Sequence, residues 1–192
     1  MPGSGGRPRG LSDMAGQPTL SWWVALRAIT WSTLFVGVVG VYIPSQFFGV
    51  TLARARFDTI AGVVGLCAMA AGATLMLACL AEFVTSGRGT PAPMDPPRAL
   101  VVRGPYRFVR NPMYLGMVLT LLGELALAFS RGLAGYIVSW FAIIHLVVVF
   151  YEEPTLRRKF GADYERYTRD VGRWWPRFRR RPAPPDGDPP AR

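Results

Sequence analysis

The sequence predicts an all-α integral membrane protein: a helical bundle with about four transmembrane helices, a C-terminal helical hairpin and a cytoplasmic amphipathic helix. Of its 192 residues, 51% are hydrophobic and only 18% are charged, whereas soluble domains carry about 25% charged residues. The apolar residues gather in four long runs, and most basic residues stand before, between or after those runs. These three features exclude an ordinary soluble domain.

The four apolar runs have the length of membrane spans, since a helix needs roughly 17–25 residues to cross the hydrocarbon core. They cover residues 22–43, 59–84, 113–129 and 133–151. The first is longer than the roughly 7–15 apolar residues of a signal peptide and lacks a following small-residue cleavage site, so it is expected to stay in the protein.

Short connections and small residues predict how the spans pack. The last two spans are joined only by Ser130, Arg131 and Gly132, which predicts a tight antiparallel hairpin. The second span carries small residues at helical spacing, a pattern that favours the close approach of another helix. These residues are Ala61, Gly65, Ala68 and Gly72.

The distribution of basic residues predicts the orientation. With both termini in the cytoplasm, 18 of the 22 Lys and Arg residues lie on the cytoplasmic side and three on the other, as the positive-inside rule requires. We expect a multi-pass protein of a bacterial inner membrane. No basic surface interleaved with aromatics stands apart from the spans, so nucleic-acid binding is not expected. Cys67 and Cys79 match no metal or redox spacing, and no metal site is expected.

One membrane domain is expected over residues 19–181, flanked by disordered segments at 1–18 and 182–192 that offer little apolar surface to bury. After the last span, apolar residues recur at helical spacing and predict one helix on the cytoplasmic surface. They are Leu156, Phe160, Tyr164 and Tyr167. The aromatic and basic run 173–181 suits anionic lipid headgroups, which are the expected partners of this segment.

Ionisable residues inside spans need a reason, because a charge at the centre of a span costs roughly 2.5–3.5 kcal/mol. Glu82 and Glu124 lie toward the ends of their spans, which favours structural roles. His145 precedes Glu152 by seven residues, so both are expected on one helix face. This face either lines a ligand cavity that opens to the cytoplasm, or the histidine bonds to a neighbouring helix.

The segment 98–116 is the other polar cluster. Pro112 suits the first turn of a helix, and Arg110 and Asn111 stand directly before that helix N-terminus, a position that attracts anions. The segment therefore predicts a carboxylate or phosphate site, unless the arginines only anchor the loop. With Glu152 and Glu153 expected at the same membrane surface, the pattern suits a ligand of mixed charge.

Two motifs carry a resemblance to a known family. From Gly104 to Gly116 the chain resembles the signature of the isoprenylcysteine carboxyl methyltransferase family and related phospholipid methyltransferases, in which Gly-x-Tyr is followed by Arg-His-Pro-x-Tyr-x-Gly. The second signature begins at Glu152-Glu153-Pro-Thr-Leu and continues through Phe160-Gly161 to Arg173-Trp174. The resemblance covers about residues 98–177.

The resemblance implies a membrane methyltransferase that uses S-adenosylmethionine and takes a lipophilic small molecule or a lipid from the bilayer as its methyl acceptor. His145, Glu153 and Arg110 are the candidate catalytic residues, His145 or Glu153 as proton acceptor. The residues implied to bind the cofactor are Arg98, Ala99, Leu100, Val101, Tyr106, Asn111, Pro112, Met113, Tyr114, His145 and Glu152.

Two departures from the family pattern bear on the chemistry. Asn111 stands where the family commonly has histidine, and an amide does not titrate, so a general base is not expected there. Val148 stands where isoprenylcysteine enzymes have an arginine one turn before the first glutamate, which argues against a prenylcysteine carboxylate as acceptor. The rival functions are an isoprenylcysteine-type carboxyl O-methyltransferase, an NADPH-dependent membrane reductase, and a non-enzymatic membrane protein with a lipid-binding basic tail.

Overall fold

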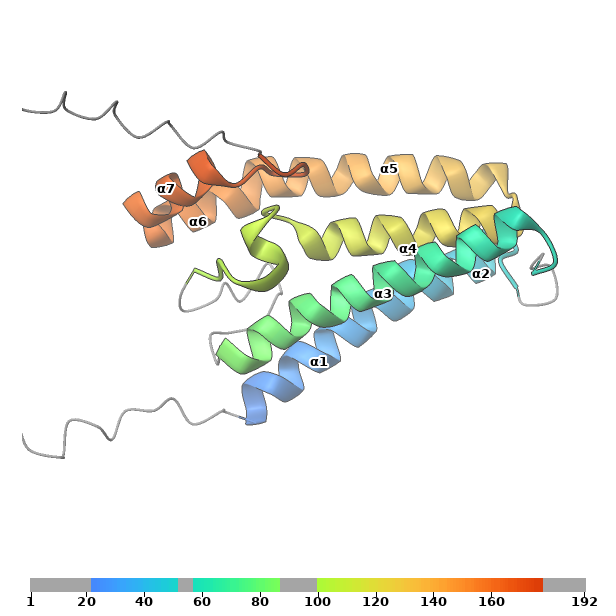
Figure 1. Cartoon of the computed structure of the whole chain (residues 1–192), viewed down its shortest axis with the longest axis horizontal. Helices are drawn as coiled ribbons and strands as arrows, with labels where there is room; N and C mark the ends of the chain where they lie inside the picture. Colours follow the sequence, from blue (N-terminus) through green and yellow to red (C-terminus); the bar gives the residue numbers. More distant parts are fainter. Residues whose placement is uncertain (1–21, 52–56, 87–99, 178–192) are drawn as a thin grey trace, which may run out of the picture.

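The computed structural model describes residues 22–51, 57–86 and 100–177, and the regular structure of these ranges is helical. Its long helices lie side by side in an antiparallel bundle (Figure 1), which confirms the predicted fold class. The helices are α1 (Trp22–Gly37) continued by the π-helical turn η2 (Val38–Tyr42) and α2 (Ile43–Phe48), α3 (Ile60–Ser86), α4 (Pro112–Ala128), α5 (Arg131–Val147) continued by the π-helical turn η5 (Val148–Glu152) and α6 (Glu153–Phe160), and α7 (Ala162–Asp170). The segments 1–18 and 182–192 lie outside the described residues.

Three of these helical stretches are long and apolar enough to cross a membrane: Ile29–Phe48, Ile60–Phe83 and Arg131–Phe160. The remaining expected span forms α4, a shorter apolar helix of 17 residues. At 1.5 Å per residue α4 is about 26 Å long, close to the roughly 30 Å of a hydrocarbon core.

The first helix is longer than the sequence predicts. The expected end at residue 43 is wrong, because the helix continues through Pro44 to Phe48. In the wide turn η2 the N–H of Ile43 bonds to the Val38 carbonyl, five residues back. In a regular α-helix the ring of a proline clashes with the carbonyl group four residues before it. The wide turn ahead of Pro44 departs from this spacing, so the helix can continue through the proline. Gly49, with φ of 67°, ends the helix.

Glycines bring α3 and α4 together, as the small residues of the second span predict. A Cβ atom on Gly72 would lie 2.5 Å from the Gly116 carbonyl oxygen, and one on Gly65 would lie 2.7 Å from that of Gly123. Neither helix has room for a side chain at these crossings. The two backbones are thus in contact along most of α4, the arrangement that small residues permit between membrane helices.

The predicted hairpin between the last two spans is confirmed, with a turn slightly earlier than expected. Phe129 adopts a left-handed conformation (φ 49°), and the Ser130 hydroxyl accepts a hydrogen bond from the N–H of Leu133. Because Ser130 caps α5 in this way, the helix begins at Arg131. The core of the bundle packs beside this hairpin around Met76, Met117, Leu121, Leu133, Ile137 and Trp140.

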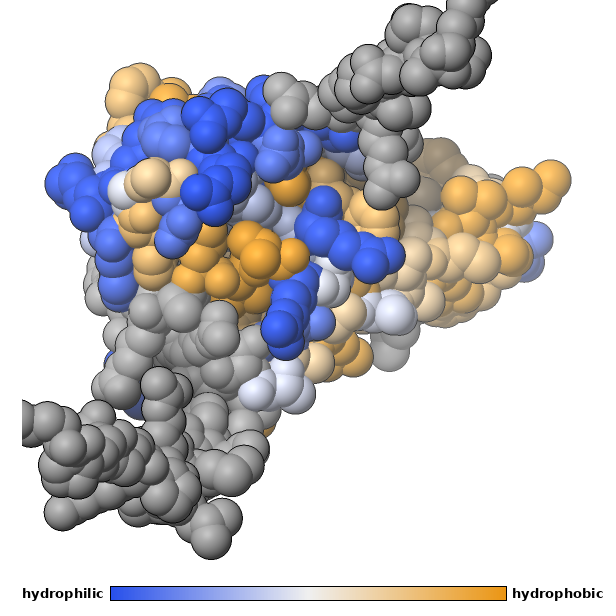
Figure 2. Space-filling model, turned by 60° about the vertical axis from the view of Figure 1, so that its left-hand side comes forward, coloured by the Kyte–Doolittle hydropathy of each residue, from blue (hydrophilic) through white to orange (hydrophobic). Residues whose placement is uncertain are grey.

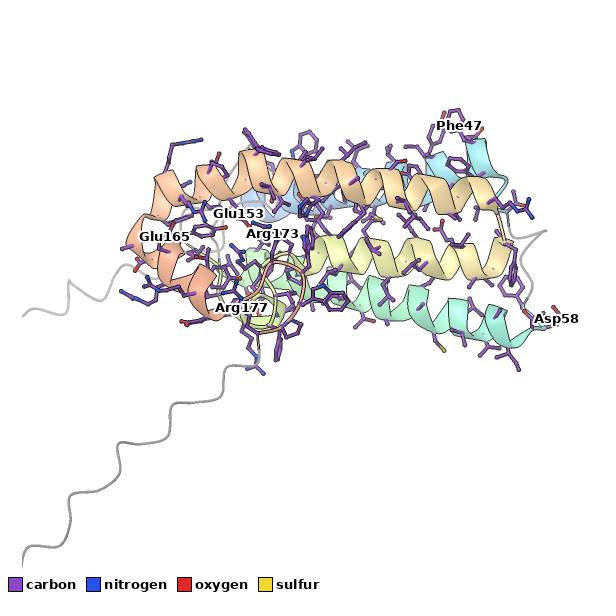
Figure 3. All side chains as sticks on the ribbon, turned by 90° about the horizontal axis from the view of Figure 1, so that it is seen from above. Phe47, Asp58, Glu153, Glu165, Arg173 and Arg177 are labelled. Atoms are coloured by element: carbon purple, nitrogen blue, oxygen red, sulfur yellow. The ribbon has the colours of Figure 1, made fainter. Side chains whose placement is uncertain are left out.

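At the opposite end of the bundle lie the start of α1 and the helices α6 and α7 (Figure 1). Charged side chains, among them Glu153, Glu165 and Arg173, gather at this end (Figure 3), which we call the polar end. The segment beyond the last span is helical, as predicted, but it forms two helices and not the single one expected. Gly161, with φ of 51°, separates α6 from α7, so α7 turns back and packs Tyr164 and Tyr167 against Leu100 and Leu156. The loop 100–111 is thereby held between α3 and α7.

Candidate functional site

The site is built on the loop that precedes α4. A short 3-10 turn, η4 (Gly104–Arg107), packs the Tyr106 ring edge-on against Phe83 of α3. Gly104 has φ of 54°, and a Cβ atom there would lie 2.5 Å from a carboxylate oxygen of Glu82. The backbone angle favours glycine, and the Glu82 side chain occupies the space where a Cβ atom would lie. This turn fixes the direction in which Arg110 and Asn111 enter α4.

Residues 171–177, called the C-terminal segment below, cross the start of α4. Val109 and Gly172 form a parallel bridge, and the Arg110 N–H donates to the Gly172 carbonyl at 2.8 Å. The Asn111 side-chain amide donates to the Arg173 carbonyl at 3.3 Å. A Cβ atom on Gly172 would collide with the Trp175 carbonyl, so the segment can turn tightly only with glycine. The polar end is closed by pairing between segments about 60 residues apart.

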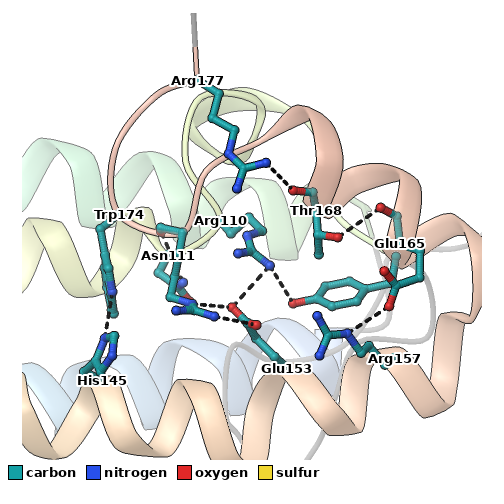
Figure 4. Close-up of polar contacts among 11 residues, drawn as sticks. Arg110, Asn111, His145, Glu153, Arg157, Glu165, Thr168, Trp174 and Arg177 are labelled. Carbon is teal, nitrogen blue, oxygen red and sulfur yellow. Dashed lines mark hydrogen bonds and ion pairs between the residues drawn. The ribbon is translucent and has the colours of Figure 1, made fainter. Parts of the chain in front are cut away.

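Arg173 of this segment forms a cluster of three charges with two buried side chains, Arg110 and Glu153 (Figure 4). Glu153 accepts two hydrogen bonds from Arg173, at 2.6 and 2.9 Å, and lies 3.2 Å from Arg110. The side chains of Arg110 and Glu153 are 8% and 5% exposed, and that of Arg173 is 30% exposed. Two guanidinium groups share one carboxylate, so the three side chains together carry a net positive charge.

Arg110 has a buried donor that is unpaired among the described residues. One of its terminal nitrogens donates to the Tyr164 hydroxyl at 3.4 Å and faces Glu153, but its buried Nε–H has no hydrogen-bond partner among the described residues. An unpaired buried donor costs about 1–3 kcal/mol. A net positive cluster with a free buried donor is suited to an anionic group.

Tyrosines surround the cluster and stay neutral. Burial raises the pKa of Tyr167, and its hydroxyl donates to the Tyr106 carbonyl at 2.7 Å. Burial, with the nearby Glu153 charge, also raises the pKa of Tyr164. The hydrogen bond to Glu153 raises the pKa of Arg173. The positive charge is therefore carried by the arginines while the phenols serve as hydrogen-bonding groups.

The expectation that His145 and Glu152 share one face is wrong, and the π-helical turn η5 explains why. Tyr114 of α4 donates a hydrogen bond to Glu152. His145 instead accepts a hydrogen bond at its Nδ1 from the Trp174 indole at 3.0 Å. It therefore faces the C-terminal segment, as does Glu153, eight residues later (Figure 4). The wider turn holds more residues than an α-helical turn and shifts the face by about one position.

The structure brings most of the sequence-predicted site residues to the polar end. Tyr106, Asn111 and Tyr114 lie on one side, and His145, Glu152 and Glu153 lie on the facing helix. The other predicted residues, apart from Arg110, have packing roles or are not described. Leu100 packs on α7, Val101 and Pro112 are buried, Met113 packs against the bundle core, and Arg98 and Ala99 lie outside the described residues.

The sequence by itself gives no site role to Arg173, Trp174 or Tyr164. In the sequence, Arg173 and Trp174 stand out only as part of a motif and as surface anchors, yet both contact the facing helix. The signal that could have found Arg173 is the adjacent pair Glu152-Glu153, because a buried carboxylate needs a cation. Nothing in the spacing shows which of the eleven basic residues after Tyr151 supplies it.

The fold and the site define a class: a helical integral membrane protein with a buried group of opposite charges at one end of its bundle. The sequence profile of the phospholipid methyltransferase family matches residues 60–163, from the start of α3 into α7. This is more than half of the chain, and the protein belongs to this family of membrane methyltransferases. No curated protein and no solved structure matches the chain.

Proposed function

We propose that this membrane methyltransferase uses S-adenosylmethionine and transfers the methyl group to a lipophilic small molecule or a lipid. One observation carries the proposal: the polar end presents a buried guanidinium, Arg110, whose Nε–H has no hydrogen-bond partner among the described residues, and a carboxylate on the facing helix, Glu152. The cofactor bears a carboxylate, an ammonium group and a ribose diol, so it needs groups of both signs at one site. The motifs around Arg110 and Glu152 support the same interpretation.

The residues fit that set of groups. The free Nε–H of Arg110 would hold a carboxylate by a charge-assisted hydrogen bond. Glu152, which already accepts from Tyr114, keeps a second carboxylate oxygen for an ammonium or hydroxyl donor. Asn111, with its carbonyl oxygen as a further acceptor, stands next to Arg110. We assign these residues, with Tyr106 and Tyr114, to cofactor binding.

The chain's own contribution to the reaction is alignment. When bound, S-adenosylmethionine supplies a methyl group on a sulfonium sulfur to the acceptor's nucleophile. Orientation in such a displacement can contribute about 7–11 kcal/mol. Glu153 orients Arg110 and Arg173 by ion pairing, and the C-terminal segment keeps water from the start of α4. We therefore propose a positioning role for Glu153.

His145 is the remaining candidate proton acceptor. While its Nδ1 accepts from the Trp174 indole, the neutral ring carries its proton on Nε2 and offers a donor. In this arrangement we propose that His145 holds a polar atom of the bound molecules, and that an amine acceptor enters in its neutral form. Proton acceptance by His145 requires that the Trp174 hydrogen bond open.

The acceptor is proposed to be neutral or an amine. Val148 is buried, with 1% of its surface exposed, at the position where a cation for a carboxylate acceptor is expected. A carboxylate brought into a buried site without a fixed cation costs several kcal/mol. Arg110 is already shared between Glu153 and the proposed cofactor carboxylate. Among the described residues at the site, a farnesylcysteine-type carboxylate therefore has no cation reserved for it.

We further propose that the polar end faces the cytoplasm of a bacterial cell, where a water-soluble cofactor is available. The basic residues of loop 85–112 and of the tail support this orientation. The acceptor then enters from the bilayer, and anionic lipids meet the basic C-terminal residues.

The cofactor is tested by calorimetric titration of the purified full chain with S-adenosylhomocysteine and, separately, with NADPH. Glu152→Ala and Tyr114→Phe should each weaken binding of S-adenosylhomocysteine about tenfold, or about 1.4 kcal/mol, with unchanged helical circular dichroism. Tyr136→Phe is the matched control, since it also removes one hydrogen bond, to the Val39 carbonyl, but inside the bundle. Normal binding by both site variants, or binding of NADPH alone, would overturn the assignment.

The acceptor is tested with methyl-labelled cofactor, offered in parallel with total membrane lipid and with a farnesylcysteine analogue. We expect label in a lipid-soluble product that resists mild base. A base-labile methyl ester on the analogue, with no labelled lipid, would establish a carboxyl methyltransferase instead.

A further inference from the structure

An apolar groove lies on the outside of the bundle at the polar end. Leu75 of α3, Leu115 of α4, Phe108 and the side chains of Trp174 and Trp175 are among its walls. Its volume is about 330 Å³, at the lower end of the roughly 300–1,000 Å³ of small-ligand sites. All of its lining residues are apolar. The groove is open along one side, so a long molecule can lie in it without entering the bundle.

The groove spans the depth at which a lipid chain meets its headgroup. Leu75 lies eight residues before Phe83, where the candidate span of α3 ends, and is thus about 12 Å below that end. Phe108 and Trp175 come from segments outside the spans and are 53% and 81% exposed. One end of the groove is therefore at hydrocarbon depth and the other at the surface.

Basic side chains stand at the surface end. Arg107 is exposed, with its guanidinium 4.5 Å from the centre of the Phe108 ring. Arg177 directly follows the lining residue Pro176 and is also exposed, while it donates to the Thr168 and Arg169 carbonyls. Figure 2 shows apolar surface framed by hydrophilic residues at this end of the molecule. An apolar groove with cations at its mouth complements a molecule with an apolar chain and an anionic head.

The apolar lining decides between kinds of occupant. A peptide in the groove would bring backbone N–H and C=O groups that find no partners there, and each buried unpaired group is costly. An acyl chain has no such groups. The cations at the mouth then favour a phosphate head, since each basic residue near an anionic lipid contributes about 1 kcal/mol.

We propose that this groove binds one acyl chain of an anionic phospholipid, with the phosphate beside Arg107. The site is separate from the proposed cofactor site, because the Trp174 indole lies between them: it lines the groove and also donates to His145 and packs on Phe141. The inference therefore does not depend on the proposed methyl transfer. The lipid holds the C-terminal segment against α3 and α4.

The test uses the purified full chain in phosphatidylcholine nanodiscs that contain a trace of phospholipid with a photoreactive group on one acyl chain. Labelled phosphatidylglycerol and labelled phosphatidylcholine are compared, and labelled peptides are mapped by mass spectrometry. We expect phosphatidylglycerol to label Leu75, Leu115 and the 174–176 peptide in preference to the outward faces of α3 and α5. Its yield should exceed that of phosphatidylcholine about fivefold, which is about 1 kcal/mol.

Matched variants separate the groove from general lipid contact. Leu75→Trp fills the groove and should lower the labelling of Leu115 and of the 174–176 peptide about fivefold or more. Leu77→Trp, on the same helix but 65% exposed, should leave that labelling unchanged. Arg107→Gln should remove the preference for phosphatidylglycerol, whereas Arg158→Gln, exposed on α6, should keep it.

The wild-type map alone can overturn the proposal, so it does not depend on the folding of any variant. Label spread evenly over the outward helix faces, or equal yields for the two headgroups, would refute an anionic phospholipid site. A parallel arm uses a photoreactive free fatty acid. If the fatty acid labels the groove and an excess of unlabelled phosphatidylglycerol does not reduce that labelling, the occupant is a single-chain carboxylate. This outcome would also refute the proposal.

Discussion

Glu153→Gln tests the idea that one carboxylate holds the polar end together. The substitution keeps the shape of the side chain but removes the charge that Arg110 and Arg173 share. Arg110 would then be a nearly buried cation with only neutral side-chain partners among the described residues, the Tyr164 hydroxyl and the new amide. Removing one partner of a buried ion pair costs about 3–5 kcal/mol. Because glutamine can still accept one hydrogen bond and Arg173 is partly exposed, we expect the lower figure, about 3 kcal/mol.

The loss of stability should be confined to the contact between the C-terminal segment and the start of α4. The Arg110 amide, which donates to the Gly172 carbonyl, reports the opening of that contact by hydrogen exchange. About 3 kcal/mol corresponds to roughly a hundredfold faster exchange at this amide. Amides of α3 near Gly65 and Gly72 should exchange at an unchanged rate, since the helices there are held by their own packing.

Glu165→Gln is the matched control. Glu165 also pairs with an arginine, Arg157, at 2.9 Å, but both side chains are about half exposed. An exposed pair contributes about 0–1 kcal/mol, so exchange at the Arg110 amide should change little. Similar small effects in both variants would refute the reasoning, and so would a Glu153→Gln effect spread equally over the membrane helices.

Three further predictions concern the bundle. With Cys67 and Cys79 replaced, a cysteine at position 131 should react with a membrane-impermeant reagent from outside the cell and one at 157 only from the cytoplasm; the reverse pattern would invert the proposed orientation. Gly72→Ala should cost about 1–3 kcal/mol by overpacking, because its Cβ would lie 2.5 Å from the Gly116 carbonyl oxygen, and should lower the melting temperature in detergent. Gly135→Ala is the control, since a Cβ atom there meets open space. Equal shifts in melting temperature for the two variants would contradict close α3–α4 packing. Glu124→Met should raise the melting temperature in detergent, because it removes a buried carboxylate oxygen without a hydrogen-bond partner among the described residues. The expected gain in stability is about 1 kcal/mol or more. A lower melting temperature would show that the carboxyl group is needed.

Local features of the sequence predict the transmembrane architecture well. Long apolar runs mark the helices, the three residues between the last two runs require a hairpin, and Gly65 and Gly72 mark the face of α3 on which α4 packs. Each of these depends on neighbours within a few turns of one helix. The family motifs likewise place Arg110, Tyr114 and Glu152 at one end of the bundle from residue order alone.

Two local predictions fail where the backbone departs from the ideal α-helix. The helix continues through Pro44, and His145 faces Trp174 and not the side of Glu152, because π-helical turns at 38–42 and 148–152 add to the residues per turn. A sequence pattern read with 3.6 residues per turn cannot detect such a turn. Gly161 is visible in the sequence, but its positive φ, which ends α6, is a property of the packed chain.

The sequence by itself determined that this chain is a helical membrane protein, which end of its bundle carries the charges, and which motifs meet there. These follow from hydropathy and from residue order, since apolar helices must cross the bilayer and short loops leave few choices. Only the tertiary structure decided which charges pair. Glu153 meets Arg110, 43 residues before it, and Arg173, 20 residues after it, because the C-terminal segment folds back over α4. Many basic residues could neutralise that carboxylate on charge alone, and the choice depends on long-range packing that brings two particular guanidinium groups within hydrogen-bonding distance.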